Sequence, residues 1–179
     1  SDIFLTAPTG AGKSLLFQVP AFYLSEKYNL VTIIISPLIA LMKDQVNALK
    51  TDRGFEKVAY INSELSLTDR EEIINDTHDG NIDILYLSPE LFLSYSIDYF
   101  VGKRILGLLV IDEAHLVTTW GRDFRVDYWF LGNHLNKLRK YVQEFPILTV
   151  TATAVYGGEN DMVYDTIDSL YLNNTIKYI

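Results

Sequence analysis

The sequence contains no cysteine, and no apolar stretch approaches the roughly 20 residues that a membrane-spanning helix needs. Without cysteine, neither a disulfide framework nor a cysteine-based zinc site can form. A reducing compartment is therefore permitted, and the cytoplasm is the location that we expect, with no membrane as a partner. The chain starts with Ser1 and Asp2 directly before an apolar run, without an initiator Met, which indicates a segment of a longer protein.

Basic residues are also few. Lys and Arg number 15 against 23 Asp and Glu, so the formal net charge is −8. Phosphate contacts supply most of the non-specific affinity for nucleic acids, and proteins that bind them usually present a basic surface. The overall charge argues against such a partner, and any nucleic-acid site must therefore depend on local residues.

The chain lacks internal repeats, low-complexity tracts and linker-like stretches rich in proline, glycine or serine. Its 179 residues suffice for one sizeable core and are too few for two ordinary domains. With 49% apolar and 21% charged residues, the composition excludes a disordered or coiled-coil chain. We therefore expect a single globular domain over residues 1–179.

Short apolar runs alternate with longer segments of helical spacing, which indicates βαβ units and a mostly parallel sheet. Several runs are apolar at consecutive positions, as is typical of strands covered on both faces. The predicted class is α/β, with a central sheet between layers of helices. Strands are predicted at 3–6, 31–36, 57–61, 82–88, 106–112 and 147–151. Helices are predicted at 13–26, 38–50, 68–78, 89–100, 127–143 and 159–171, the third with Thr68 and Glu71 as a capping box.

A glycine-rich loop, APTGAGKS at 7–14, joins the first strand to the first helix. Gly10 and Gly12 would let the backbone approach phosphate oxygens, which backbone N–H groups and the helix N-terminus attract. Lys13 is expected to bridge the β- and γ-phosphates of ATP, and the Ser14 hydroxyl to ligate Mg²⁺. The alternative is an ordinary glycine-rich turn with an exposed lysine. The predicted nucleotide-binding residues are Thr9, Gly10, Ala11, Gly12, Lys13, Ser14 and Leu15.

The fifth predicted strand ends in LLVIDEAH at 108–115. Open α/β sheets bind ligands at the carboxyl ends of their strands. Asp112 is expected to hold Mg²⁺, directly or through water, and Glu113 to orient and deprotonate the attacking water. The alternative is that both acids merely favour the N-terminus of a following helix. Taken alone, His115 would be structural or exposed.

Taken in order, four motifs resemble those of the first motor lobe of superfamily 2 helicases. They are APTGAGKS, SPLIALMKDQV at 36–46, DEAH at 112–115 and TATA at 151–154. SPLIALMKDQV and WGRDFRVDY at 120–128 are similar, more narrowly, to the RecQ group of DNA helicases. The resemblance implies a RecA-like P-loop NTPase lobe that hydrolyses ATP and acts on DNA. It also implies that His115 works with the catalytic Lys13, Asp112 and Glu113.

The resemblance further implies where DNA would bind. In the RecQ group an aromatic-rich loop couples single-stranded DNA binding to hydrolysis, and aromatic faces and arginine suit unpaired bases. Departures from the family pattern occur at Ala7, Arg122 and Val126, where glycine, histidine and proline are frequent. Without the resemblance, these segments would be turns and core-packing aromatics. The implied contact and coupling residues are Ser36, Pro37, Lys43, Ser88, Pro89, Trp120, Phe124, Arg125, Thr151 and Thr153.

Three functions remain open. The first is an ATP-dependent DNA helicase that tracks single strands and unwinds duplexes, the second a translocase or remodeller that does not separate strands, and the third a non-catalytic nucleotide switch. A P-loop kinase would explain neither DEAH nor TATA. The family's second lobe, which carries an arginine finger, would be a partner from the same parent protein. Because that finger contributes orders of magnitude to turnover, this chain alone is expected to hydrolyse ATP poorly.

Overall fold

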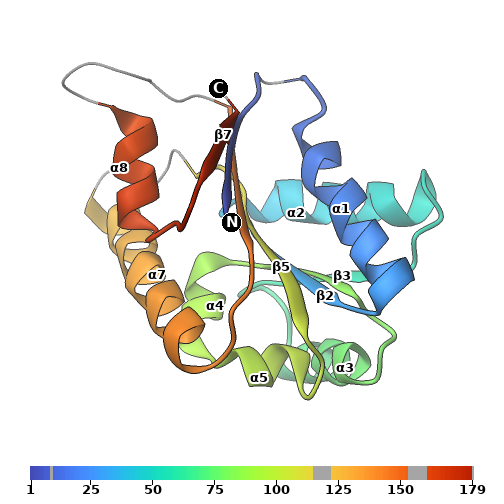
Figure 1. Ribbon diagram of the computed structural model, residues 1–179. Coiled ribbons are helices and arrows are strands. Elements are labelled where there is room, and N and C mark those ends of the chain that lie inside the picture. Colours follow the sequence, from blue (N-terminus) through green and yellow to red (C-terminus); the bar gives the residue numbers. More distant parts are fainter. Residues whose placement is uncertain (9, 115–121, 153–160, 179) are drawn as a thin grey trace. The chain divides into compact units, whose positions relative to one another are not determined.

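The computed structural model describes residues 1–8, 10–114, 122–152 and 161–178, with the side chains of 122–129 outside that description (Figure 1). The chain divides into two compact units, each described by itself. Unit 1 contains Ser1–Lys13 and Val110–Ile179, and unit 2 contains Ser14–Leu109. Within the described residues, no helix has both the length and the apolar character needed to cross a membrane.

The described strands are hydrogen-bonded in the order β3-β4-β2-β5-β6-β1-β7. The pairs β1–β6, β1–β7, β2–β4 and β3–β4 are all parallel. A parallel sheet with helical connections is an α/β fold, so the predicted class is confirmed. The strands are β1 (Ile3–Thr6), β2 (Val31–Ile35), β3 (Val58–Ile61), β4 (Ile84–Leu87), β5 (Leu106–Ile111), β6 (Ile147–Thr151) and β7 (Ile176–Tyr178).

Unit 2 is built around β2, β4 and β3. Every residue of β2 and β4 is buried, which explains the uninterrupted apolar runs in the sequence. Its helices are α1 (Lys13–Tyr28, whose first residue belongs to unit 1), α2 (Ile39–Thr51), α3 (Leu67–His78), α4 (Pro89–Ser94) and α5 (Ile97–Val101).

Two helix predictions in unit 2 were wrong. The helix predicted at 89–100 is interrupted, because Tyr95 is extended and the Ser96 side chain accepts the Tyr99 N–H to begin α5. The predicted capping box at Thr68 does not form. Ser66 is the N-cap of α3 instead, and its hydroxyl accepts the N–H of Asp69.

Unit 1 pairs β1 with both β6 and β7 and adds α7 (Arg122–Tyr141) and α8 (Met162–Ser169). The buried carboxylate of Asp2 joins these segments. It accepts two hydrogen bonds from the Arg139 guanidinium, at 2.8 and 3.0 Å, and others from the N–H groups of Ile147 and Asn173. Strand β7 was not predicted, since its three residues are partly exposed and carry no clear apolar pattern.

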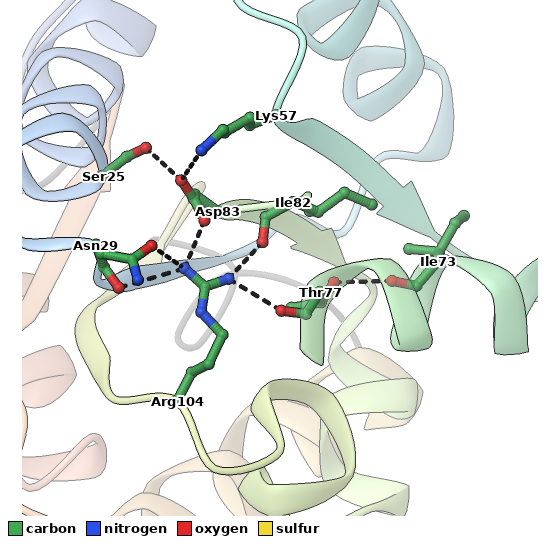
Figure 2. Close-up of polar contacts among 8 residues, drawn as sticks. All are labelled: Ser25, Asn29, Lys57, Ile73, Thr77, Ile82, Asp83 and Arg104. Carbon is green, nitrogen blue, oxygen red and sulfur yellow. Dashed lines mark hydrogen bonds and ion pairs between the residues drawn. The ribbon is translucent and has the colours of Figure 1, made fainter. Parts of the chain in front are cut away.

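A second buried carboxylate, Asp83, lies just before β4 in unit 2 (Figure 2). The Arg104 guanidinium bonds to it at 2.5 Å and the Ser25 hydroxyl at 2.6 Å, while the Lys57 ammonium lies 3.6 Å away. Arg104 also donates to the backbone carbonyls of Thr77 and Ile82, and to Asn29. This network therefore ties the C-terminal ends of α1 and α3 to the start of β4.

Arg104→Ala is expected to lower the free energy of unfolding by about 3–5 kcal/mol, because it leaves the buried Asp83 charge without its closest cation. Lys57→Ala is the matched control. The Lys57 side chain is 48% exposed, so its loss should cost less than about 1 kcal/mol. Urea denaturation of both variants measures the difference, and equal costs would show that Arg104 is not the dominant partner.

Candidate functional site

The ends of β1 and β6 in unit 1 position the phosphate loop. Immediately after β1, the Ala7 N–H donates to the Thr151 carbonyl at 3.0 Å, and the Ala11 N–H then closes a turn onto the Pro8 carbonyl at 3.1 Å. Gly10 and Gly12 have φ angles of 84° and 73°, a region that side chains disfavour. The loop thus turns through left-handed backbone before entering α1 at Lys13.

Lys13 contacts Glu113 within unit 1. Its ammonium nitrogen lies 3.2 Å from Glu113 Oε1, and the two side chains are only 14% and 16% exposed. Glu113 itself has φ 54°, which is uncommon for a residue other than glycine and indicates local backbone strain. The next residue, Ala114, donates its N–H to the Val150 carbonyl at 3.1 Å. The turn after β5 therefore carries Glu113 to the lysine of the phosphate loop.

Asp112 is buried at the end of β5, with 3% of its surface exposed, and its Oδ1 accepts the Glu113 N–H at 2.9 Å. Burial, followed by the charge of Glu113, raises the pKa of Asp112 to about 6, against the opposing influences of that N–H and of Lys13. Burial disfavours the carboxylate, whereas a bound cation would favour it. Asp112 is therefore a group whose charge depends on what occupies the site.

The predicted backbone-contact residues of unit 2 lie at the carboxyl ends of its strands. Ser36 follows β2 and Ser88 follows β4, and both are buried. Among the described residues, neither hydroxyl has a hydrogen-bond partner. The Ser36 N–H donates to the Leu87 carbonyl at 3.0 Å, which holds the two strand ends together.

Sequence reasoning missed Asn62, which directly follows β3. It is fully buried, and its Nδ2 has no partner in the described part of the chain. The register aligns the last residues of β2, β4 and β3, so Ser36, Ser88 and Asn62 form one row. The sequence pattern could have predicted Asn62, because a polar residue directly follows each of three apolar strands that end at the same edge.

Lys43 of α2 is exposed and already paired. Its ammonium lies 2.7 Å from Glu64 Oε2, and this hydrogen bond raises the pKa of Lys43. The Glu64 N–H in turn donates to Asn62 Oδ1 at 2.9 Å. A phosphate that reached Lys43 would therefore compete with Glu64. Pro37 is partly exposed, and Pro89 is buried as the first residue of α4.

Several predicted site residues lie outside the described residues, namely Thr9, His115, Trp120 and Thr153. Phe124 and Arg125 fall in α7, where the description covers the backbone and not their side chains. Thr151 is buried at the end of β6, and Leu15 is 38% exposed on α1. The structure thus brings Lys13 and Glu113 together in one unit, and Ser36 and Ser88 in the other.

The chain matches a known protein family over most of its length. Residues 1–159 match the family described as DEAD/DEAH box helicase. The chain belongs to the DEAD/DEAH box helicase family. The matched residues include the phosphate loop at 7–14 and the DEAH segment at 112–115, so the resemblance inferred from the motifs is confirmed.

Within the DEAD/DEAH box helicases, the chain is similar to proteins of the RecQ type. It is 40% identical to ATP-dependent DNA helicase Q5 of Mus musculus over 90% of its own length and 16% of that protein. It is 36% identical to RecQ of Haemophilus influenzae over 99% of its own length and 26% of that protein. It is also 36% identical to the probable helicase RecS of Bacillus subtilis over 99% of its own length and 33% of that protein. The chain thus spans a third or less of each of these relatives.

Solved structures support the fold of a helicase lobe. The DUF1998 helicase MrfA, bound to DNA and AMPPNP, matches the whole chain over 25% of its own length, with a TM-score of 0.77 and 17% identity. The helicase domain of Pyrococcus furiosus Hef matches 99% of the chain over 34% of its own length, with a TM-score of 0.69 and 18% identity. At these identities the likeness shows the fold alone.

The raised pKa of Asp112 predicts how stability depends on pH. Folding raises the pKa of this acid from 3.8 to about 6. The contribution of its protonated carboxyl to the free energy of unfolding is therefore complete below pH 3.8 and is lost as the pH rises through 6. Asp112→Asn should therefore be more stable than the wild type at pH 8, by about 2–3 kcal/mol.

Urea denaturation of the ligand-free chain between pH 4 and pH 8 measures this effect. The difference between Asp112→Asn and the wild type should vanish toward pH 4. Asp44→Asn, on the exposed side of α2, is a control that should follow the wild type. A constant difference across the pH range would contradict the assignment.

Proposed function

We propose that this chain is the ATP-binding motor lobe of an ATP-dependent DNA helicase similar to RecQ. In this proposal, hydrolysis drives movement along single-stranded DNA and unwinding of duplexes. The observation that carries the proposal is the contact between Lys13 and Glu113, which joins the phosphate loop to the DEAH acids in one part-buried pair. The names of the relatives, which are ATP-dependent DNA helicases, support the choice of DNA.

The residues present suit ATP and Mg²⁺. A Cβ built at Gly10 would meet no atom within 4 Å, so the loop leaves open space beside a left-handed backbone turn. Lys13 supplies a cation for phosphate oxygens. The hydroxyl of Ser14 and the carboxylate of Asp112 are the oxygen donors that Mg²⁺ prefers. When bound, Mg²⁺ would neutralise charge on the phosphates. Thr9, Ala11, Gly12 and Leu15 complete the proposed nucleotide contacts.

The pairing of Lys13 with Glu113 suggests an order of events. In the structure, each side chain neutralises the other. When a triphosphate enters the loop, Lys13 moves to its oxygens and releases Glu113, which then accepts a proton from the attacking water. Asp112, which directly follows β5, would hold the metal, and His115 belongs to the same proposed catalytic set. The second lobe of the parent protein would supply the remaining catalytic charge.

The row formed by Ser36, Ser88 and Asn62 is the proposed contact with the DNA backbone, next to Pro37, Pro89 and Lys43. Hydroxyls, amides and backbone N–H groups make many such contacts, so the row is compatible with a net charge of −8. Trp120, Phe124, Arg125, Thr151 and Thr153 are the proposed coupling residues. The cytoplasm is the proposed location, which the absence of cysteine permits.

Glu113→Gln tests the hydrolytic role. In the protein that joins this chain to its second lobe, turnover of ATP should fall by about 10²–10⁴-fold, because the glutamine cannot accept the proton. Binding of a non-hydrolysable ATP analogue should be retained, since Lys13 remains. Unchanged turnover would assign the base to another residue or the hydrolysis to a contaminant. A strand-displacement assay on the same protein separates a helicase from a translocase that does not unwind.

Lys43→Ala tests the nucleic-acid role. Loss of one phosphate contact should weaken binding to single-stranded DNA and lower the salt dependence, d log K/d log[salt], by about 0.7. Glu64→Gln should do the reverse and tighten binding by up to about five-fold, because the competing carboxylate is gone. Asp44→Asn removes one negative charge at an exposed position of α2 and is the control. If Lys43→Ala has no effect, this residue does not contact DNA.

A further inference from the structure

Helix α1 begins at the phosphate loop, so its placement sets the position of Ser14. Two polar side chains of α1, Gln18 and Ser25, are buried. They are seven residues apart and therefore lie on the same side of the helix, about two turns from each other. This side of α1 faces the residues of β4, since both side chains bond there.

The two bonds reach opposite ends of the strand. Gln18 Nε2 donates to the hydroxyl of Tyr86 at 3.1 Å, and the Ser25 hydroxyl donates to Asp83 at 2.6 Å. Ser25 lies toward the C-terminus of α1, where Asp83 is also held by Arg104 and Lys57 (Figure 2). That end of α1 is therefore fixed by buried charge.

The bond of Gln18 lies between the two proposed binding sites. Gln18 is four residues after Ser14, about 6 Å along the helix. Tyr86 is two residues before Ser88, about 7 Å along the extended chain. Gln18 is 7% exposed and Tyr86 is fully buried, and their polar groups bond to each other. This pair would act by positioning what lies on either side of it.

The strength of the two anchors differs. The bond between Gln18 and Tyr86 joins two neutral groups, whereas the Asp83 network is charge-assisted and has several donors. Charge-assisted bonds are stronger than neutral ones. When α1 shifts at its phosphate end, movement about the fixed Ser25 end would therefore be transmitted through Gln18 to Tyr86. The strand end beyond Tyr86 carries the buried Ser88 hydroxyl, which has no hydrogen-bond partner in the described part of the chain.

We propose that Gln18 and Tyr86 are positioning residues that couple the nucleotide site to the DNA-binding edge. The inference rests on the proposed function, because it links the two sites of that proposal. Nucleotide binding at Ser14 changes the placement of α1, and the hydrogen bond passes this change to the end of β4. Coupling of binding is reciprocal, so DNA at Ser88 alters nucleotide affinity by the same factor.

Tyr86→Phe tests the coupling, because it removes only the hydroxyl and keeps the buried ring. In the protein containing both lobes, affinity for a single-stranded oligonucleotide is measured with and without Mg²⁺ and a non-hydrolysable ATP analogue. The ratio of the two dissociation constants is the coupling factor. Tyr86→Phe should move this ratio at least three-fold toward 1, while affinities for each ligand alone stay within two-fold of the wild type.

The double variant Gln18→Leu with Tyr86→Phe guards against a folding artefact. Replacing both partners by apolar groups of similar shape removes both ends of this bond, so the double variant should fold and show the same reduced coupling as Tyr86→Phe. Ser25→Ala is the matched control. It removes a buried bond between the same helix and the opposite end of β4, away from Ser14, where Arg104 still bonds to Asn29 just after α1, and its coupling ratio should equal that of the wild type.

The outcomes separate this inference from the proposed function. If the wild type binds DNA with a nucleotide-dependent affinity and Tyr86→Phe keeps the full ratio, the coupling role is wrong and the proposed function stands. Equal loss of coupling in Ser25→Ala would likewise overturn the role, because general loosening of α1 would then explain it. A wild type that binds no single-stranded DNA would overturn the proposed function and this inference together.

Discussion

The parallel pairing of β1 with β6 determines the arrangement of the candidate nucleotide site. Thr6 lies opposite Thr151, and the next residue, Ala7, donates its N–H to the Thr151 carbonyl. The carbonyl one residue earlier on β6, that of Val150, accepts the N–H of Ala114. Consecutive carbonyls of one strand thus hold both the start of the phosphate loop and the turn after β5. This explains why Lys13 and Glu113, 100 residues apart in the chain, lie 3.2 Å apart.

Much of the fold could be predicted because it depends on local patterns. Buried parallel strands need consecutive apolar residues, and the runs at 31–36 and 147–151 match β2 and β6 closely. The wrong predictions lie where hydrogen bonds outside this apolar pattern set the bounds of an element. The hydroxyl of Ser66 begins α3 earlier than expected, and Ser96 starts a new helix after an extended residue. Strand β7 is formed by its pairing with β1, and no local sequence pattern predicts this pairing.

The motif order predicts Lys13, Asp112 and Glu113 as site residues, because each residue type suits one chemical task, and their roles stay predictions. The state of these side chains could not be predicted from the sequence. The ion pair between the first and the last, the left-handed backbone at Glu113 and the raised pKa of Asp112 all arise from neighbours distant in sequence. The same holds for Asn62, whose partners in the row become neighbours only through the strand register. The overall charge carries no information on this row, since a few hydroxyls at one edge contribute nothing to it.

The left-handed backbone at Glu113 sets a limit on how far this lobe could be stabilised by selection or by design. Glycine adopts such a φ angle without steric cost, so a search for thermostable variants would favour glycine at this position. That substitution would remove the proposed base together with the strain. Thermal stability and ATP turnover are therefore opposed at one residue. Selection for stability alone would be expected to yield a protein that binds nucleotide without hydrolysing it.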